Sequence, residues 1–271
     1  MRKPESLSFT TKPGEKIELA EMDTVGPTKG IDKQEAEKII ERNAKTMAGL
    51  ARRMYAENLQ SLLLVLQGMD ASGKDGTIRN VMQGVNPRSC IVYSFKKPTD
   101  AELAHDFLWR VHKVVPPKGY IGIFNRSHYE DVLVVRVHNL VPQDVWEKRY
   151  EQINNFEKLL VESRVTMLKC FLHVSKEEQR KRLQERVDVP EKRWKFNPVD
   201  LNERALWSEY QSAYEAALYR CNTAHAPWHI IPADRKWYRN LIVSQLLTKT
   251  LEKMNPQFPS SYEDVEGVIV E

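Results

Sequence analysis

Residues 62–74 carry the sequence LLLVLQGMDASGK, in which five consecutive apolar residues run directly into a turn of small residues. A continuous apolar run of this length is typical of a strand that is buried on both faces. The turn has the spacing GxxxxGK, because Gly68 is followed by Gly73 and Lys74. Between a buried strand and a helix, this spacing indicates a phosphate-binding P-loop.

The chemistry of a P-loop explains its residue types. Glycine lets the backbone curl until successive N–H groups point at one phosphate, and the following helix adds its positive N-terminal end. The lysine places a compact charge on the phosphoryl oxygens. We therefore expect phosphate to bind through the loop and the helix that follows, at Gly68, Ala71, Ser72, Gly73, Lys74, Asp75, Gly76, Thr77 and Arg79.

On both sides of this motif the chain alternates between strand-like and helix-like segments. Apolar runs predict strands at 62–66, 90–95, 120–124, 165–174 and 228–231. Apolar residues at helical spacing, with Asp32 and Ser175 as N-caps, predict helices at 32–58, 74–83, 100–114, 142–163, 175–187, 200–223 and 234–254. This alternation indicates an α/β protein of the P-loop kinase fold: a five-stranded parallel sheet with helices on both faces and a helical lid.

Composition narrows the classes of protein. Of 271 residues, 41% are hydrophobic, which is enough for a core and too much for a disordered chain. Three scattered cysteines exclude a disulfide framework, and the lack of a long apolar run argues against a signal peptide or membrane helix, so we expect a cytoplasmic protein with no membrane partner. The net charge of +4 suits anionic ligands but is too small to indicate nucleic acid, which we do not expect as a partner.

The expected domain organisation is simple. We expect one P-loop kinase domain over residues 32–255, with its lid at about 180–205. An irregular extension, rich in proline and glycine, precedes it at 1–31. A loose acidic tail follows at 256–271.

Two acidic residues depart from the usual P-loop. Asp75 occupies the position after the lysine, where a serine or threonine hydroxyl ordinarily helps to hold Mg²⁺. Asp70 lies within the loop, where an uncompensated carboxylate would repel the phosphates. Such a carboxylate is useful if it holds Mg²⁺ or accepts a proton from the incoming nucleophile. The alternative is that Asp70 points into solvent.

A second polar cluster follows the third predicted strand. Asn125 stands where many P-loop kinases have an acid, and Arg126 comes directly after it. We expect Arg126 to clamp a phosphoryl group and Asp131 to be a metal ligand beside Asp70. The predicted nucleotide-binding residues are Asn125, Arg126 and Glu130. The predicted catalytic residues are Asp70, Lys74, Arg126 and Asp131.

Basic residues crowd the segment after the fourth predicted strand. The order helix, basic loop, helix is that of a kinase lid, which closes over phosphates and excludes water. Taken without the P-loop, the basic run is more typical of a solvated helix face than of a lid. The predicted lid residues are Arg182, Arg186, Lys192, Arg193 and Lys195. Four aromatic residues further on have helical spacing and are interpreted as packing residues rather than a base-stacking surface: Trp207, Tyr210, Tyr214 and Tyr219.

Three motifs in this order resemble the polyphosphate kinase 2 family. They are GMDASGKDGT at 68–77, FNRSHYED at 124–131 and RWKFNPVD at 193–200, and the resemblance spans about residues 35–255. Members of that family have a P-loop kinase core with a lid. The resemblance is strongest to the class III subgroup, whose members accept both AMP and ADP. From the compact length we expect a one-domain member rather than the tandem-domain form of some AMP-specific members.

The resemblance implies a reaction in which the terminal phosphoryl group of inorganic polyphosphate passes to AMP, giving ADP, and to ADP, giving ATP. It implies Mg²⁺ or Mn²⁺ as cofactor, with Asp70 near metal and acceptor phosphate and Asp131 holding metal. It implies that Lys74 and Arg126 bind phosphates, and that lid residues 186–195 contact polyphosphate or nucleotide. A homo-oligomer is also implied, and guanine nucleotides stay open as further acceptors.

Two other functions stay open on the sequence alone. An ATP-dependent nucleoside or nucleotide kinase would share the sheet, the P-loop and the lid, although Asn125 in place of the acid speaks against it. A non-catalytic P-loop module would bind a partner through its basic surface. Against that reading, the chain carries the full predicted catalytic set together.

Overall fold

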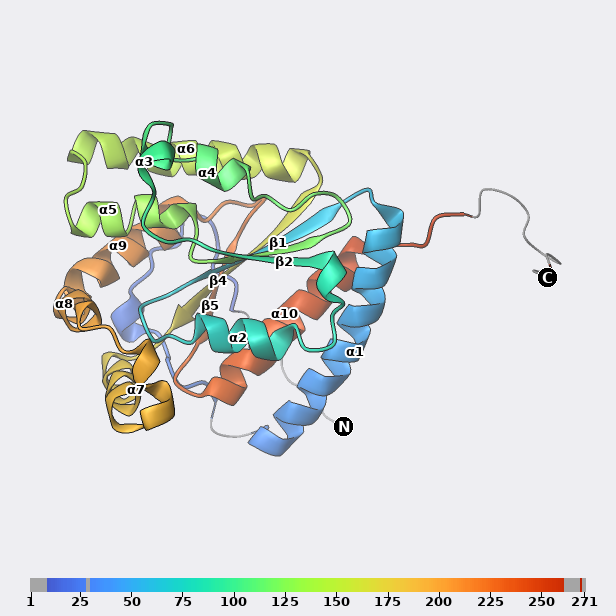
Figure 1. The fold of residues 1–271 in the computed structure, drawn as a ribbon, viewed down its shortest axis with the longest axis horizontal. Helices are drawn as coiled ribbons and strands as arrows, with labels where there is room; N and C mark the ends of the chain where they lie inside the picture. The colour runs from blue at the N-terminus through green and yellow to red at the C-terminus, as the bar shows by residue number, and fades with distance from the viewer. Residues whose placement is uncertain (1–8, 28–29, 261–268, 270–271) are drawn as a thin grey trace.

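In the computed structural model, which describes residues 9–27, 30–260 and 269, five parallel strands form one sheet (Figure 1). The strand order is β2-β3-β1-β4-β5. The strands are β1 (Ser61–Gln67), β2 (Cys90–Ser94), β3 (Ile121–Asn125), β4 (Val165–His173) and β5 (Trp228–Pro232). Each coincides with a predicted strand to within about two residues, so the predicted α/β fold with a five-stranded parallel sheet is confirmed.

The central strand β1 positions the P-loop. All seven of its residues are buried, and Leu64 lies beside Ile123 of β3 and Leu168 of β4. Neighbouring parallel strands end at the same edge of the sheet, so β1 and β3 bring their following turns together. The backbone N–H of Arg126, just past β3, accordingly donates to the Leu66 carbonyl oxygen at 3.1 Å.

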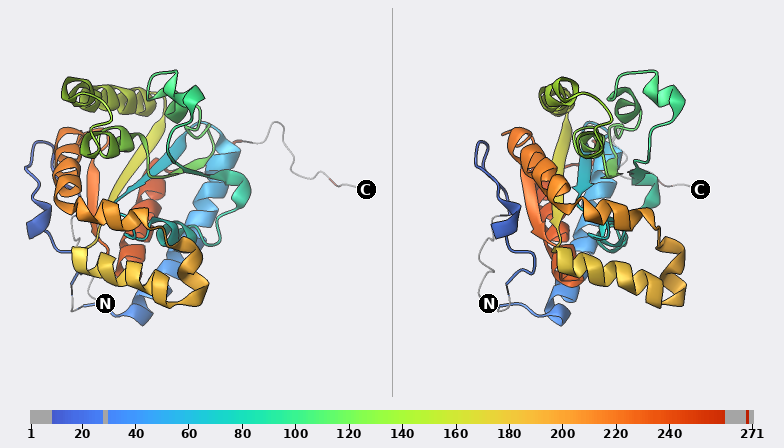
Figure 2. Two further views of the ribbon diagram at one scale, coloured as in Figure 1. Left: turned by 60° about the vertical axis from the view of Figure 1, so that its left-hand side comes forward. Right: turned by 90° about the vertical axis from the view of Figure 1, so that its left-hand side faces the viewer.

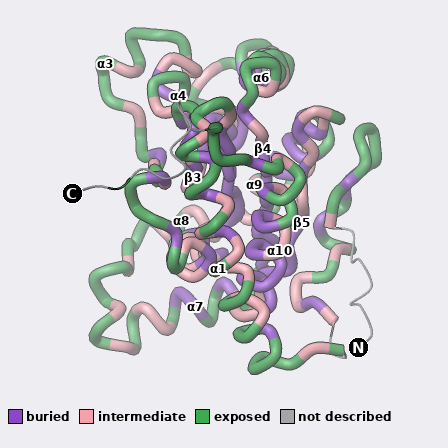
Figure 3. The backbone as a smooth tube through the Cα atoms, turned by 90° about the vertical axis from the view of Figure 1, so that its right-hand side faces the viewer, coloured by how far each residue is buried: buried purple, intermediate pink, exposed green. Residues whose placement is uncertain are grey.

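Helices cover both faces of this sheet (Figures 1 and 2). The helices α1 (Lys33–Glu57), α2 (Lys74–Val81) and α10 (Lys236–Met254) pack together on one face, while α6 (Gln143–Glu162) and α9 (Trp207–Arg220) lie on the other. Asp32 caps α1, because its carboxylate accepts the N–H of Glu35 at 2.8 Å, as predicted. Buried residues concentrate in the sheet and on the helix faces that cover it (Figure 3).

Two of the predicted helices are wrong in one respect, because each is divided into two shorter helices in the structure. The segment 100–114 contains two short helices, α3 (Asp100–Leu103) and α4 (Trp109–His112). The segment 200–223 contains α8 (Val199–Ala205) and α9, which meet at Leu206. Neither break has a glycine or proline, so the apolar spacing alone gave no stop signal.

The segment between β4 and β5 leaves the sheet before it returns. It contains α7 (Lys176–Asp188), the 3-10 helix η4 (Pro190–Lys195) and then α8. Ser175 caps α7 as predicted, because its hydroxyl accepts the Glu178 N–H at 3.1 Å. Two shorter elements follow β3, namely η3 (His128–Asp131) and α5 (Val134–Val137).

Residues 9–27 extend the sheet edge at β5. The Thr11 N–H donates to the Trp228 carbonyl oxygen at 3.1 Å, and the Ile230 N–H donates to the Phe9 carbonyl oxygen at 2.9 Å. The described part of the predicted irregular extension holds one 3-10 turn, η1 (Leu19–Glu21). Most of the predicted acidic tail lies outside the described residues. Among the described residues, no helix is both long enough and apolar enough to cross a membrane.

Candidate active site

The P-loop, residues 68–74, curls between β1 and α2 with almost no space beside its glycines. Gly68 has φ +151°, and a Cβ there would lie 2.7 Å from the Leu172 carbonyl oxygen. Gly73 has φ +102°, and a Cβ there would lie 1.9 Å from an Nη atom of Arg239. Both motif glycines are therefore required by the close packing around the loop as well as by its left-handed backbone.

Lys74 lies against the loop and is buried. Its Nζ donates to the carbonyl oxygens of Gly68 at 2.7 Å and Met69 at 3.3 Å. Burial and the neighbouring Arg126 guanidinium lower the pKa of Lys74 to about 8, against the opposing effect of Asp70 and other carboxylates. An ammonium group has three N–H donors, so one is left for a ligand beyond these two carbonyls.

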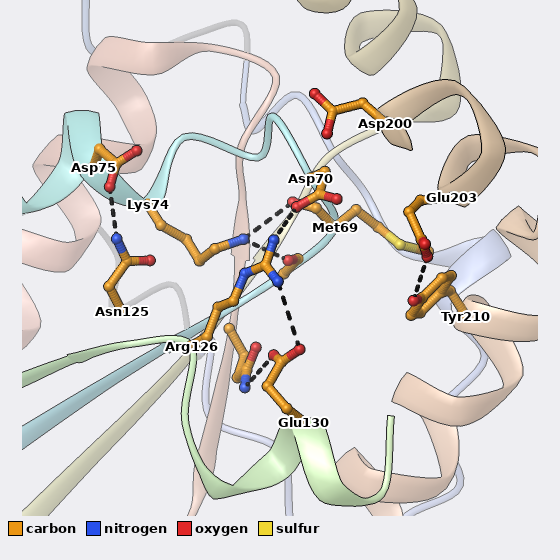
Figure 4. Close-up of polar contacts among 12 residues, drawn as sticks. Met69, Asp70, Lys74, Asp75, Asn125, Arg126, Glu130, Asp200, Glu203 and Tyr210 are labelled. Carbon is orange, nitrogen blue, oxygen red and sulfur yellow. Dashed lines mark hydrogen bonds and ion pairs between the residues drawn. The ribbon is translucent and has the colours of Figure 1, made fainter. Parts of the chain in front are cut away.

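Asp70, Arg126 and Glu130 come together beside the loop (Figure 4). Arg126 Nη2 donates to Asp70 Oδ1 at 2.6 Å, and its Nη1 lies 3.8 Å from Glu130 Oε2. Gln67, at the end of β1, donates to Glu130 Oε1 at 3.2 Å and so fixes that carboxylate. Arg126 has φ +62°, a backbone conformation that non-glycine residues adopt at an energetic cost and often at functional sites.

The two positions that depart from the usual P-loop kinase pattern contact each other. Asn125 Nδ2 donates to Asp75 Oδ1 at 2.6 Å, which joins the end of β3 to the first turn of α2. Many P-loop kinases have an acid at the end of β3. Here Asn125 occupies that position, and the carboxylate in this contact belongs to Asp75 of α2. A carboxylate in the first turn of a helix is favoured by the helix dipole. Neither residue lines the pocket that Asp70 faces.

Asp131 lies apart from this group, although it directly follows Glu130. Its Oδ1 accepts from Arg149 at 3.0 Å, and its Oδ2 lies 3.8 Å from Arg110. Burial raises the pKa of Asp131 to about 6, and the two arginines act in the opposite direction. The carboxylate does not line the pocket. The geometry therefore favours Glu130 over Asp131 as the second carboxylate beside Asp70.

Of the nine predicted phosphate-binding residues, Gly68 lines the pocket, and the other eight, Lys74 among them, belong to the loop or α2 without lining it. The Ser72 hydroxyl is buried and has no hydrogen-bond partner among the described residues. The Thr77 hydroxyl donates back to the Gly73 carbonyl oxygen at 3.1 Å. Gly76 packs under Arg239, and Arg79 is exposed on α2. Their contribution to phosphate binding stays a prediction.

Arg182 does not occupy the predicted lid position. It is buried, and all five of its N–H donors are used within the protein. Its Nε donates to Glu178 and its Nη1 to the P-loop carbonyls of Ala71 and Ser72. Its Nη2 donates to the carbonyls of residues 233 and 234. This arginine supports the P-loop from inside the protein and has no donor left for polyphosphate.

The other predicted lid residues lie on α7 and η4. Arg186 pairs with Asp200 of α8 at 2.8 Å, and Lys192 pairs with Glu185. Arg193 and Lys195 are exposed and form no ion pair with a carboxylate of the described part of the chain. Asp200 faces Asp70 (Figure 4), and burial followed by the charge of Asp70 raises the pKa of Asp200. The basic segment therefore stands over the P-loop side of the molecule.

Sequence reasoning missed several residues of this pocket. Gln179 of α7 donates to the Asp70 backbone oxygen at 3.0 Å, and Tyr210 of α9 donates to Glu203 of α8 at 2.6 Å. The full lining is Gly68, Met69, Asp70, Arg126, Glu130, Val134, Gln179, Glu203, Trp207, Tyr210 and Tyr214. Three of the aromatic residues interpreted as packing thus also form a pocket wall. The only sequence signal was their position just after the predicted lid.

Comparison with known proteins gives the family of this chain. A family model described as polyphosphate kinase 2 matches residues 30–259. The chain is 57% identical over 222 residues to an AMP/ADP-polyphosphate phosphotransferase of Meiothermus ruber, covering 82% of this chain and 83% of the relative. It is 41% identical to an ADP-polyphosphate phosphotransferase of Rhodopseudomonas palustris, covering 96% and 94%.

The fold agrees as well. The crystal structure of polyphosphate kinase 2 from Arthrobacter aurescens has a TM-score of 0.91 and 39% sequence identity, covering 95% of this chain and 92% of that chain. The family match, the relatives and the fold all agree with the family that the three motifs resemble. The chain belongs to the polyphosphate kinase 2 family.

Proposed function

We propose that the protein transfers the terminal phosphoryl group of inorganic polyphosphate to AMP, giving ADP, and to ADP, giving ATP. The observation that carries this proposal is the Asp70 carboxylate inside the P-loop, paired with Arg126 at 2.6 Å, in a chain of this family. The Meiothermus ruber relative is named for both AMP and ADP, which supports both acceptors.

The pocket and the P-loop beside it suit a transfer between two anions. The P-loop backbone, the N-terminus of α2 and Lys74 bind phosphate, while Asp70 is the counter-ion of Arg126 when no substrate is present. A phosphoryl group that enters the pocket offers Arg126 new oxygen acceptors, which frees the Asp70 carboxylate. Phosphoryl transfer needs little covalent chemistry from a protein, so positioning and charge stabilisation carry the step.

Asp70 and Glu130 suit Mg²⁺ or Mn²⁺ by their chemistry. Both are partly exposed carboxylates that line the same pocket, and hard divalent cations prefer such oxygen donors together with substrate phosphates. Among the described residues, no three His, Cys, Asp or Glu side chains group together to hold a metal alone. When bound, the metal would neutralise charge that develops on the phosphoryl oxygens. We propose Asp70 and Glu130 as its protein ligands.

The basic segment around η4 is the proposed lid of one kinase domain spanning residues 32–255. Arg186, Arg193 and Lys195 are its candidate contacts for polyphosphate, because a linear polyanion needs a cationic track more than a base pocket. Trp194 is 79% exposed beside them. Closure of this segment would exclude water, which otherwise turns phosphoryl transfer into hydrolysis.

A donor–acceptor matrix tests the proposal. Polyphosphate or ATP is supplied as the only donor to AMP, ADP or GDP with Mg²⁺, and the nucleotides are separated by chromatography. We expect ADP and ATP from polyphosphate with AMP, and ATP from polyphosphate with ADP. Turnover with ATP and none with polyphosphate would reject the proposal in favour of an ATP-dependent nucleotide kinase. The GDP arm decides whether guanine nucleotides are acceptors.

A further inference from the structure

A buried arginine of α10, Arg239, lies behind the P-loop and takes no part in the function proposed above. Its side chain is 2% exposed, and its Nη1 donates to the Ser72 carbonyl oxygen at 3.0 Å. Arg182 donates to the same carbonyl oxygen at 3.0 Å. Neither arginine lines the pocket that Asp70 faces. Two guanidinium groups thus converge on one carbonyl oxygen of the P-loop.

The two arginines differ in their counter-ions. Arg182 has the Glu178 carboxylate at 2.9 Å. Arg239 has only the neutral amide of Asn240, whose Oδ1 accepts from Nε at 3.2 Å and from Nη2 at 2.9 Å. Within the described ranges, no carboxylate forms an ion pair with Arg239. Burial and the Arg182 guanidinium lower the pKa of Arg239 below its ordinary value, as is expected for a desolvated charge without an anion.

The charge of Arg239 lies against the backbone of the P-loop and of the first turn of α2. A Cβ on Gly73 would lie 1.9 Å from its Nη1, and a Cβ on Gly76 would lie 3.4 Å from its Nη2. The guanidinium therefore touches the backbone that turns into α2. The N–H groups with which a P-loop binds a phosphate belong to this same stretch of backbone.

We propose that Arg239 is a positioning residue for the phosphate chain: its uncompensated charge lies against the backbone of Gly73 and attracts the anion that the P-loop binds. The proposal rests on the proposed function, because it takes phosphate as the ligand of the loop. A buried charge without a counter-ion is unfavourable, and an anion on the loop relieves that cost. Part of the affinity for polyphosphate therefore comes from a residue that does not touch it.

The structure offers a direct test in Asn240→Asp, which supplies the missing carboxylate without changing Arg239. The aspartate keeps an oxygen where Asn240 Oδ1 accepts both N–H groups, so the hydrogen bonds are retained. Equilibrium binding of inorganic tripolyphosphate is measured by calorimetry, beside the KM for polyphosphate and kcat. We expect Kd and KM to rise about tenfold, with kcat changed less than about threefold, because the local charge is neutralised.

A matched control variant is Asn43→Asp. Asn43 of α1 also contacts α10, where its Nδ2 donates to Ser244 Oγ at 3.0 Å, one helical turn beyond Asn240. It adds the same charge to the same helix pair further from the loop. We expect tripolyphosphate binding within about twofold of the unmodified protein, since the interaction weakens with distance and screening. An equal loss in both variants would overturn the proposal.

A second pair of variants applies if Asn240→Asp does not fold. Arg239→Lys keeps the charge and should hold tripolyphosphate within about threefold, whereas Arg239→Met removes it and should weaken binding about tenfold. Equal binding by Arg239→Met and the unmodified protein would overturn the proposal while leaving the proposed function intact. Unmodified protein that neither binds tripolyphosphate nor turns over polyphosphate would refute the proposed function, and this inference with it.

Discussion

Two buried lysines of this protein lie beside carboxylates, and they differ in how fully their donors are used. Lys169, in the middle of β4, is completely buried and donates to Glu157 at 2.6 Å, the Cys221 carbonyl oxygen at 2.7 Å and the Tyr129 hydroxyl at 2.9 Å. All three of its N–H groups have partners. Lys74 donates only to the carbonyl oxygens of Gly68 and Met69, two residues that line the pocket.

The carboxylates differ in the same way. Glu157 is fully buried and accepts from Lys169, from the Tyr129 hydroxyl at 2.7 Å and from His128 at 3.2 Å. Burial alone would raise the pKa of Glu157, but Lys169 and His128 hold it below its ordinary value. Asp70 instead has one guanidinium and a free approach from the pocket. A charged group whose hydrogen bonds are left incomplete beside a pocket therefore indicates a functional site, whereas the fully paired charges of Lys169 and Glu157 are explained by stability.

The largest expected effect comes from changing Asp70, the carboxylate that lines the pocket. Asp70→Asn should lower kcat with polyphosphate by about a thousandfold or more, because it removes a charge placed at the reacting phosphates. Its free energy of unfolding should change by less than about 1 kcal/mol, since the Asp70 carboxylate is partly exposed. Steady-state kinetics and urea denaturation measure the two quantities.

Asp131→Asn is the matched control for Asp70→Asn. It makes the same chemical change at a carboxylate that pairs with Arg149 and does not line the pocket. We expect less than about a tenfold loss of kcat, since a side chain outside the pocket acts only indirectly. An equal loss in both variants would restore Asp131 as a metal ligand.

Loss of the buried Lys169–Glu157 ion pair should have the opposite effect, lowering stability more than turnover. Lys169→Met leaves the buried Glu157 carboxylate without its cation and should lower the free energy of unfolding by about 3–5 kcal/mol. Adding Glu157→Gln should recover part of that loss, because the remaining charge is removed. Lys74→Met should instead preserve stability and lose turnover. Urea denaturation with kinetics separates the cases, and a stable Lys169→Met variant would contradict the comparison.

The pH dependence of Lys74 gives a smaller effect with a defined sign. Its pKa is lowered to about 8, so the charged form predominates below that pH and is lost as the pH rises through it. We expect kcat/KM for polyphosphate to fall about tenfold per pH unit above pH 8, because this profile reports the free enzyme. Lys74→Arg should move the fall to higher pH. A flat profile between pH 7 and 10 would refute the role of its charge.

The smallest expected effect concerns the aromatic wall. Tyr210→Phe removes the hydrogen bond to Glu203 that joins α9 to α8. The KM for polyphosphate should rise about two- to fivefold, in keeping with the loss of one partly exposed hydrogen bond. Tyr219→Phe is the control, because Tyr219 is 47% exposed on the same helix and does not line the pocket. Identical kinetics for both variants would remove Tyr210 from the site.

Most of the fold was predictable because its signals are local. The strands are short apolar runs between turn residues, and the P-loop spacing lies between a strand and a helix. The breaks at Leu206 and at residues 104–108 were not predictable, because no residue there forbids a helix. Tertiary packing decides such breaks, and apolar spacing does not reveal it.

The placement of side chains was predictable where the motif fixes the backbone: Asp70 lines the pocket and Lys74 packs against the loop. It was not predictable where direction matters. Glu130 and Asp131 are adjacent in η3, yet one lines the pocket and the other pairs with arginines outside it. Likewise, the basic run on α7 does not tell which arginine faces inward, and Arg182 is the buried one. A charge pattern gives the number of cations but not their orientation.

The most direct measurement of the central claim follows polyphosphate and nucleotide together. The unmodified protein and the Asp70→Asn variant are incubated with AMP, Mg²⁺ and polyphosphate of known length, and the phosphoryl groups lost by the polymer are counted against those gained by nucleotide. We expect equal numbers with the unmodified protein and almost no transfer with the variant. Polymer loss without nucleotide gain, or unchanged transfer by the variant, would contradict the assignment of this pocket as the transfer site.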